Sequence, residues 1–188
     1  GPGADNVILN NVDSIAPGDT VILIQMKGAV IYEQETSFFG SYRESVGVPG
    51  SSEFLIVYSV NTGTNRVAFT NNILNNFNVA GIVQLIRVPS YNSVTVKTDL
   101  TCQPWDSTKK TGGVLVMIVE RNLSLAANID VTGKGFAGGT PYRGQGICLE
   151  TNTVLYDRFG YPGSFQNSGY KGESQALKVY IDATNMPS

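Results

Sequence analysis

Of the residue types in this chain, Asp and Glu could take part in the widest range of catalytic reactions. The sequence has 15 Asp and Glu residues and no His. Two carboxyl groups facing each other across a cleft could cleave a glycosidic bond. The absence of histidine excludes Ser-His-Asp and Cys-His nucleophilic sites and imidazole metal ligands. The acidic residues are spread along the whole chain and no spacing pairs two of them, so we expect no enzyme and no cofactor.

Two further sequence patterns resemble ligand-binding motifs, one for calcium and one for phosphate, but both are incomplete. Asp130, Asp157 and Asp182 lie in turn-like contexts, but none belongs to the alternating acidic loop of a dedicated calcium site. Residues 133–139 are rich in glycine around Lys134, as phosphate-binding loops are, but the order of glycine, lysine and hydroxyl differs and no helix is predicted to follow. We therefore expect neither a metal nor a nucleotide.

Aromatic side chains in the C-terminal part are the best candidates for a binding surface. Residues 149–172 form a long irregular polar stretch with several rings, and loops of this kind often carry binding sites. Such rings can stack against sugars, and the alternative is that they fold back as a cap over neighbouring strands. The candidate ligand-binding residues are Tyr142, Tyr156, Tyr161, Phe165 and Tyr170.

The two cysteines, Cys102 and Cys148, leave two alternatives open. An even number of cysteines in a chain without histidine is compatible with a disulfide. Two separate buried thiols are equally compatible, because free cysteine commonly behaves as a small buried apolar residue.

Composition narrows the class of partner. Charged residues make up only 15% of the chain, against about 25% in an average soluble domain. The formal net charge is −2, so there is no basic face of the kind that nucleic acid requires. A surface rich in amides and hydroxyls suits neutral ligands such as polysaccharides. No run approaches the ~20 apolar residues of a membrane-spanning helix, so no membrane span is expected.

Short apolar segments bounded by Gly, Pro, Asn or Asp dominate the chain and predict an all-β fold with little helix. Residues 71–78 could form one helical turn with Ile73, Leu74 and Phe77 on one side, or a crossover loop. The predicted strands are Val7–Leu9, Thr20–Met26, Ala29–Tyr32, Glu53–Val60, Arg66–Thr70, Ile82–Val88, Ser93–Val96, Val114–Val119 and Ala176–Ile181.

Residues 4–100 are expected to form a small closed β-barrel. Closure would remove sheet edges that a chain with few charges cannot protect. Residues 61–65 predict a hairpin in which Gly63 takes the positive φ, and Pro89 should end the last strand of this unit. The long loop 33–52 carries Phe38, Phe39 and Tyr42. These rings either cap one end of the barrel or bind a ligand.

Residues 101–188 are expected to begin a β-solenoid. Leu123, Leu125, Ile129 and Val131 recur in the short alternations of stacked strands, and glycine follows them. Trp105 stands in a turn-rich stretch before these strands. A lone tryptophan beside a proline more often fills a joint between layers than binds a ligand, so we expect such a joint there.

Several segments together resemble a known family. They are APGDTVILIQMKGA (16–29), FLIV (54–57), GIVQLIRVPSY (81–91), Pro104-Trp105, Gly112-Gly113 and GKGFAGG (133–139). In this order they resemble the N-terminal region of very large cell-surface proteins of gliding Bacteroidota. The resemblance covers most of residues 16 to 139. It implies an adhesin-like protein exported through the type IX secretion pathway, with a barrel-like module leading into a solenoid.

The expected function is therefore that of a non-enzymatic, secreted module displayed at the cell surface. It would serve attachment or gliding motility, with weak carbohydrate binding through ring stacking. Two alternatives remain: an accessory carbohydrate-binding domain of a polysaccharide-degrading enzyme, and a structural domain that binds a secretion or motility partner protein. Residues 1–3, Gly-Pro-Gly, are typical of the remnant left when a protease removes a purification tag.

Overall fold

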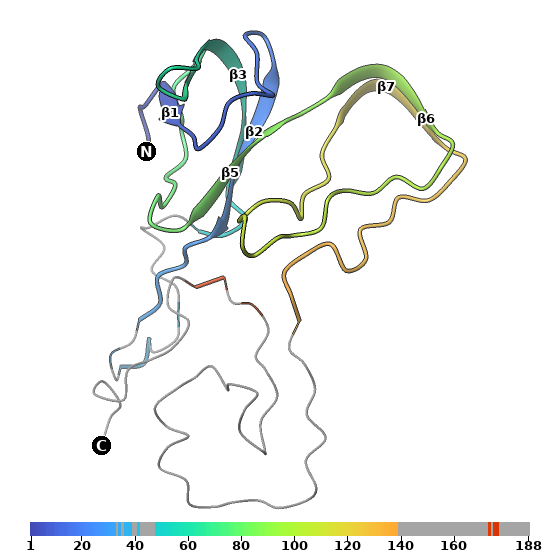
Figure 1. The fold of residues 1–188 in the computed structure, drawn as a ribbon. Coiled ribbons are helices and arrows are strands. Elements are labelled where there is room, and N and C mark those ends of the chain that lie inside the picture. Colours follow the sequence, from blue (N-terminus) through green and yellow to red (C-terminus); the bar gives the residue numbers. More distant parts are fainter. Residues whose placement is uncertain are drawn as a thin grey trace, which may run out of the picture.

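The described part of the chain is built from strands, turns and loops and contains no helix (Figure 1). A computed structural model describes residues 1–32, 34, 36–38, 41, 48–138, 173 and 175–176. The all-β prediction is confirmed for these residues. The strands are β1 (Asn6–Ile8), β2 (Thr20–Lys27), β3 (Ser52–Asn61), β4 (Arg66–Phe69), β5 (Ile82–Arg87), β6 (Ser90–Val96) and β7 (Ile118–Leu125).

Five of these strands form one antiparallel sheet in the order β1-β4-β3-β2-β5. The β3–β4 hairpin lies where it was predicted, but the residue with positive φ is Asn65, at 50°, and not Gly63. Asparagine tolerates this region better than most residues because its short polar side chain bonds locally. The Asn65 side chain donates a hydrogen bond to the carbonyl of Asn10.

The expected closed barrel is wrong, because the sheet is open. Its edge strands, β1 and β5, each have one partner among the described strands and do not pair with each other. β1 is only three residues long, so it offers few groups for closure. At the other edge Pro89 takes the chain out of the sheet, as the sequence predicted, and the next strand, β6, pairs elsewhere.

One face of the sheet carries the core, and the loops around β1 and between β4 and β5 cover it. The loop over 71–81 forms no helical turn. Ile73 and Phe77 are buried, whereas Leu74 points to solvent with 81% of its surface exposed. The three residues therefore do not share a side. The buried apolar cluster is Val12, Val21, Leu23, Leu55, Val57, Val67, Phe69, Ile73 and Phe77.

Gln25 fixes this loop to the sheet from inside. The side chain is fully buried, and its amide donates to the carbonyl of Asn78 at 3.2 Å while its oxygen accepts from the Asn78 backbone N–H at 2.7 Å. Gly81 must lie against Gly28 and Lys27 here, since a Cβ at position 81 would come within 2.2 Å of the Lys27 carbonyl oxygen. The end of β2 and the start of β5 thus meet at close range.

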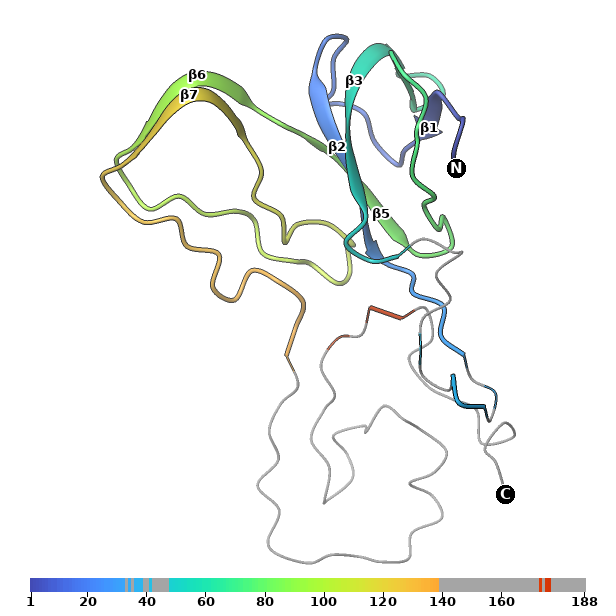
Figure 2. The same cartoon turned by 180° about the vertical axis from the view of Figure 1, so that it is seen from behind.

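β6 and β7 form a separate parallel pair on an excursion away from the sheet (Figures 1 and 2). Val94 pairs with Leu123 and Val96 with Leu125, and an isolated parallel bridge joins Leu100 to Ile129. A parallel pair needs a long crossover, and residues 97–117 supply it. The prediction for Val114–Val119 was wrong in extent, because β7 begins only at Ile118.

The other predicted strands differ in how far the structure describes them. Residues 29–32 form no named strand, although Ala29 makes an isolated parallel bridge with Ala176. The rest of the predicted strand 176–181 lies outside the described residues. In the long loop, Phe38 is exposed and its ring lies 6.0 Å from that of Tyr32, whereas Phe39 and Tyr42 lie outside the described residues.

Candidate functional site

The ligand-binding residues predicted from the sequence all lie outside the described residues. Tyr142, Tyr156, Tyr161, Phe165 and Tyr170 therefore remain predictions. The same holds for the cysteine pair: Cys102 is half-buried, and Cys148 lies outside the described residues. The described part of the chain nevertheless contains three features that could serve a function, and the first surrounds Trp105.

Residues 103–112 form a compact turn in which Asp106 holds the backbone. One carboxylate oxygen of Asp106 accepts the N–H groups of Thr108 and Lys109, both at 2.9 Å. The backbone N–H of Asp106 donates to the carbonyl of Thr111 at 2.8 Å. The Lys109 N–H, more than any other group, holds the pKa of the Asp106 carboxyl below its usual value.

The turn is fastened to the sheet at Gly112. The side-chain oxygen of Gln84, on β5, accepts the N–H of Gly112, and its amide donates to the carbonyl of Gly112, both at 3.0 Å. Gly112 has φ of 92°, and a Cβ there would lie 2.2 Å from the carbonyl oxygen of Pro104. Glycine is required at this point of close approach.

Trp105 is held in place by polar and aromatic contacts. Its indole N–H lies 2.9 Å and 2.8 Å from the two carboxylate oxygens of Glu173. Its ring system and the Phe136 ring form a T-shaped pair, with 4.9 Å between centroids and an interplanar angle of 85°. The Trp105 backbone N–H donates to the carbonyl of Lys134 at 2.8 Å. Trp105 thus connects the turn to residues 134–136 and to Glu173, which are far apart from it in sequence.

Lys27, at the end of β2, completes this cluster. It forms an ion pair with Glu173, and its ammonium lies 4.9 Å from the ring centroid of Phe136 and 5.7 Å from that of Trp105. Burial raises the pKa of the Glu173 carboxyl, but hydrogen bonds from Lys27, Trp105 and the Ala137 N–H lower it more. The pKa of Glu173 therefore lies below its usual value and the carboxylate stays charged at neutral pH.

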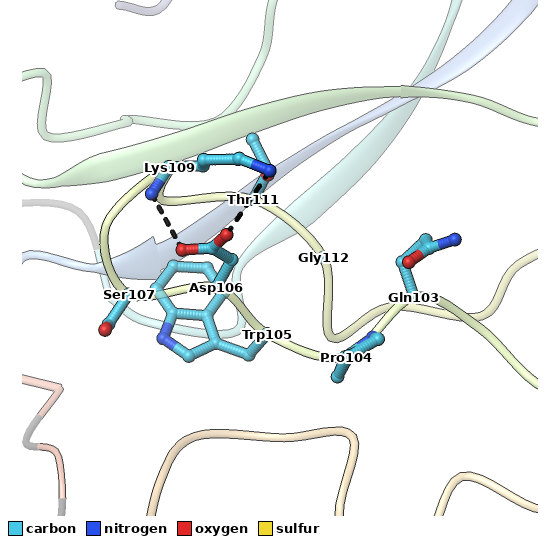
Figure 3. Close-up of a pocket in the computed structure, with 8 residues that line it drawn as sticks. All are labelled: Gln103, Pro104, Trp105, Asp106, Ser107, Lys109, Thr111 and Gly112. Carbon is cyan, nitrogen blue, oxygen red and sulfur yellow. Dashed lines mark hydrogen bonds and ion pairs between the residues drawn. The ribbon is translucent and has the colours of Figure 1, made fainter.

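The turn lines an open hollow of about 560 Å³, which we call the Trp105 hollow (Figure 3). The Asp106 carboxylate lies close to the indole and is joined to Lys109, while Gln103 and Pro104 stand on the opposite side. An indole, an amide, hydroxyls and one charge of each sign line the same space. Its lining residues are Gln103, Pro104, Trp105, Asp106, Ser107, Lys109, Thr111 and Gly112.

Trp105 was expected to fill a joint between layers, and no sequence pattern predicted the hollow. The residues that line it are common in turns, and only the position of the single tryptophan inside a turn of amide and hydroxyl residues could have indicated it. The long-range partners of Trp105, which are Lys27 and Glu173, carry no local sequence signal. Their spacing along the chain is too large and too irregular to suggest a contact.

The second feature is a row of large apolar side chains on the outer face of β3, which we call the β3 row. Phe54, Ile56 and Tyr58 alternate with the core residues of the strand, so all three point away from the core. Their exposed fractions are 55%, 48% and 69%. Phe54 lies opposite Ile22 and Ile56 opposite Thr20, so the neighbours on β2 are uncharged.

The third feature is a row of half-exposed apolar residues on and after β7. Leu123, Leu125, Ile129 and Val131 have exposed fractions between 41% and 57%. Leu123 and Leu125 stack on the β6 residues Val94 and Val96, and Val96 is buried. The β7 side of this ladder therefore leaves apolar surface in contact with solvent.

The described residues contain no group of three or more His, Cys, Asp or Glu side chains arranged to hold a metal ion. Among them there is also no helix with the length and apolarity needed to cross a membrane.

No model of a known protein family, no curated protein and no solved structure matches the chain.

Proposed function

We propose that this chain is a non-enzymatic contact module of a larger, exported cell-surface protein. It would support attachment or gliding-related adhesion through weak binding to neutral polysaccharide. The observation that carries this proposal is the β3 row, in which two rings and an isoleucine stand exposed side by side on an open sheet.

The β3 row has the features of a surface that binds by stacking. A strand rises about 3.3 Å per residue, so Phe54 and Tyr58 are separated by about 13 Å along β3, the length of a few sugar rings. Side chains on a sheet face are held by their neighbours and lose little conformational entropy on binding. Single contacts of this kind are weak, and display of many copies on one cell would raise the avidity.

The scaffold fits a role in extended surface proteins. We infer that β6 and β7 are the first two coils of a β-solenoid. Support comes from the parallel pairing and from the nearly constant offset between coils, since the Asn128 N–H bonds to the Asp99 side chain 29 positions earlier. Solenoids lengthen by adding coils, so they suit stalks that hold a contact surface away from the cell.

Among the described residues, none of the four carboxyl groups with a shifted pKa has the raised pKa of a catalytic acid. A glycoside hydrolase needs one carboxylic acid with a raised pKa as its proton donor. Glu173, where the hydrogen bonds outweigh burial, has a lowered pKa. The pKa of three aspartates is lowered as well, chiefly by the Ala16 N–H at Asp19, the Lys109 N–H at Asp106 and the Thr132 hydroxyl at Asp130.

Adhesion of protein-coated beads to surfaces coated with neutral polysaccharides tests this function. Replacing Phe54, Ile56 and Tyr58 together by serine should strongly reduce retention of the beads. The matched control replaces Leu74 and Val79 by serine, because these side chains are even more exposed, at 81% and 88%, but lie in a loop. Equal retention of both variants, or no retention of the unchanged protein on any neutral polysaccharide, would contradict the proposal.

One observation favours a second function, the binding of a partner protein during export or assembly. The half-exposed apolar residues on and after β7 form the kind of surface that another strand or protein covers. Replacing Leu123 and Leu125 by serine should then prevent co-purification with a secretion or motility component. The variant with three serines on β3 serves as the control and should keep that partner.

A further inference from the structure

We propose that the Trp105 hollow is a binding site for one or two residues of a neutral saccharide. This inference rests on the proposed function and deepens it, because it adds a pocket to a module that otherwise binds through a flat face. The hollow lies on the turn 103–112, whereas the β3 row lies on the sheet. The two sites can therefore be tested separately.

The size of the hollow suits a small ligand. Its volume of about 560 Å³ lies within the range of roughly 300 to 1,000 Å³ that is usual for small-molecule sites. The turn that forms it is anchored at both ends: Gln84 holds Gly112, and the Lys134 carbonyl holds the Trp105 backbone. A site anchored in this way loses little entropy when a ligand binds.

Trp105 supplies the stacking surface, and Glu173 orients it. Both carboxylate oxygens of Glu173 lie within hydrogen-bond distance of the indole N–H, and the Phe136 ring meets the indole at an interplanar angle of 85°. These contacts fix the angle of the indole. Glu173 is therefore a positioning residue, and it acts on a ligand through Trp105. Fixed aromatic rings present large contact area at low entropic cost.

Polar groups on the other sides match the hydroxyls of a sugar. The Oδ1 atom of Asp106 accepts two backbone N–H groups, whereas its Oδ2 atom lies 3.7 Å from the Lys109 ammonium, beyond hydrogen-bond distance. This second oxygen can accept a hydroxyl. The Gln103 amide can both donate and accept, as can the hydroxyls of Ser107 and Thr111.

Charge decides which class of ligand fits. The lining carries one carboxylate, from Asp106, and one ammonium, from Lys109, so its formal charge is balanced. The Lys109 side chain is 78% exposed and runs above the Asp106 carboxylate, which lies closer to the indole (Figure 3). A phosphorylated or acidic sugar would be repelled by this carboxylate, and the nearby ammonium groups of Lys27 and Lys109 are already paired with Glu173 and Asp106.

The single tryptophan of the chain makes the test specific. Because Trp105 is the only Trp, its fluorescence reports on the hollow alone. Titration of the full chain with neutral disaccharides, namely cellobiose, maltose, lactose and N,N′-diacetylchitobiose, should give a saturable change in emission for at least one of them. The acidic disaccharide digalacturonate should give none at the same concentrations.

Two variants probe the lining without removing the fluorophore. Gln103→Ala should weaken binding by about fivefold, as expected for the loss of one neutral hydrogen bond. Thr108→Ala is the matched control, since Thr108 lies in the same turn but outside the lining, and its affinity should not change. Saturation-transfer difference NMR on the same disaccharides gives a second readout that does not depend on tryptophan.

The outcomes separate this inference from the function on which it rests. No saturable signal by either method with any neutral disaccharide would overturn the hollow as a site. Preference for digalacturonate, or equal losses in Gln103→Ala and Thr108→Ala, would overturn it as well. In each of these cases bead adhesion that depends on the β3 row would still stand.

Discussion

The five-stranded sheet and the β6–β7 pair differ in how completely each buries its own apolar side chains. In the sheet, loops from both ends cover one face, so Val21, Val57 and Val67 have almost no exposed surface. In the parallel pair, Val96 is buried but the paired Leu125 keeps 57% of its surface exposed. The sheet thus has one apolar face that its own loops cover, although the β3 row on the other face stays exposed, whereas Leu123 and Leu125 of the parallel pair stay half-exposed.

The largest expected effect contrasts the two regions directly. Phe69→Ala in the sheet core should lower the free energy of unfolding by about 3 to 5 kcal/mol, because the cavity left by the ring cannot collapse fully. Leu125→Ala in β7 should cost about 1 kcal/mol, since much of its surface remains in water in the folded protein. Urea denaturation followed by circular dichroism measures both. Similar losses would mean that the pair shares one core with the sheet.

The hydrogen bonds that fasten the turn 103–112 to the sheet should give the next largest effect on stability. Gln84→Leu removes both hydrogen bonds to Gly112 and leaves a half-buried N–H and carbonyl without their partner, which costs about 1 to 3 kcal/mol. Amide hydrogen exchange should become faster over residues 103–113 and stay unchanged in β3 and β4. Faster exchange throughout the sheet would show that the turn supports the sheet and is not merely fastened to it.

The strands of the sheet could be predicted because apolar alternation and flanking turn residues are local signals. β2, β3 and β5 lie close to their predicted ranges. Whether the sheet closes depends on the pairing of its first and last strands, and no local pattern encodes that contact. The hairpin residue with positive φ was also missed, since both Gly63 and Asn65 tolerate such a conformation and tertiary contacts select between them.

The candidate site was less predictable than the fold. The Trp105 hollow depends on contacts between residues distant in sequence, such as the ion pair of Lys27 with Glu173 and the bonds from Gln84 to Gly112. The β3 row could have been predicted from the sequence, because Phe54, Ile56 and Tyr58 alternate with core residues. Its exposure could not be foreseen, because apolar residues on both faces of a strand normally indicate burial on both sides.

Acid should loosen the cluster around Trp105 before it affects the sheet. The pKa of Glu173 is lowered in the folded protein, so its contribution to stability is complete above its usual pKa, near 4.5, and is lost as the pH falls through the lowered value. Trp105 emission should therefore shift to the red at a midpoint below 4.5, while the circular dichroism of the sheet persists. Glu173→Gln should remove this midpoint, and Glu120→Gln, on the exposed part of β7, should leave it in place. A midpoint in the Glu173→Gln protein would assign the transition to another group.

The smallest expected effect comes from an ion pair on the sheet. Arg87 lies at the end of β5 and its guanidinium is 2.9 Å from Asp19, but its side chain is 61% exposed. Water and salt screen such a pair, so Arg87→Ala should lower stability by about 0.5 kcal/mol at low salt and by less at high salt. In the turn, Lys109→Ala should have no measurable effect, because its ammonium is more exposed and lies farther from Asp106. A larger loss of stability for Lys109→Ala than for Arg87→Ala would contradict this expectation. It would mean that the Lys109–Asp106 ion pair helps to hold the turn in shape, and that charge contributes more to the stability of the turn than to that of the sheet.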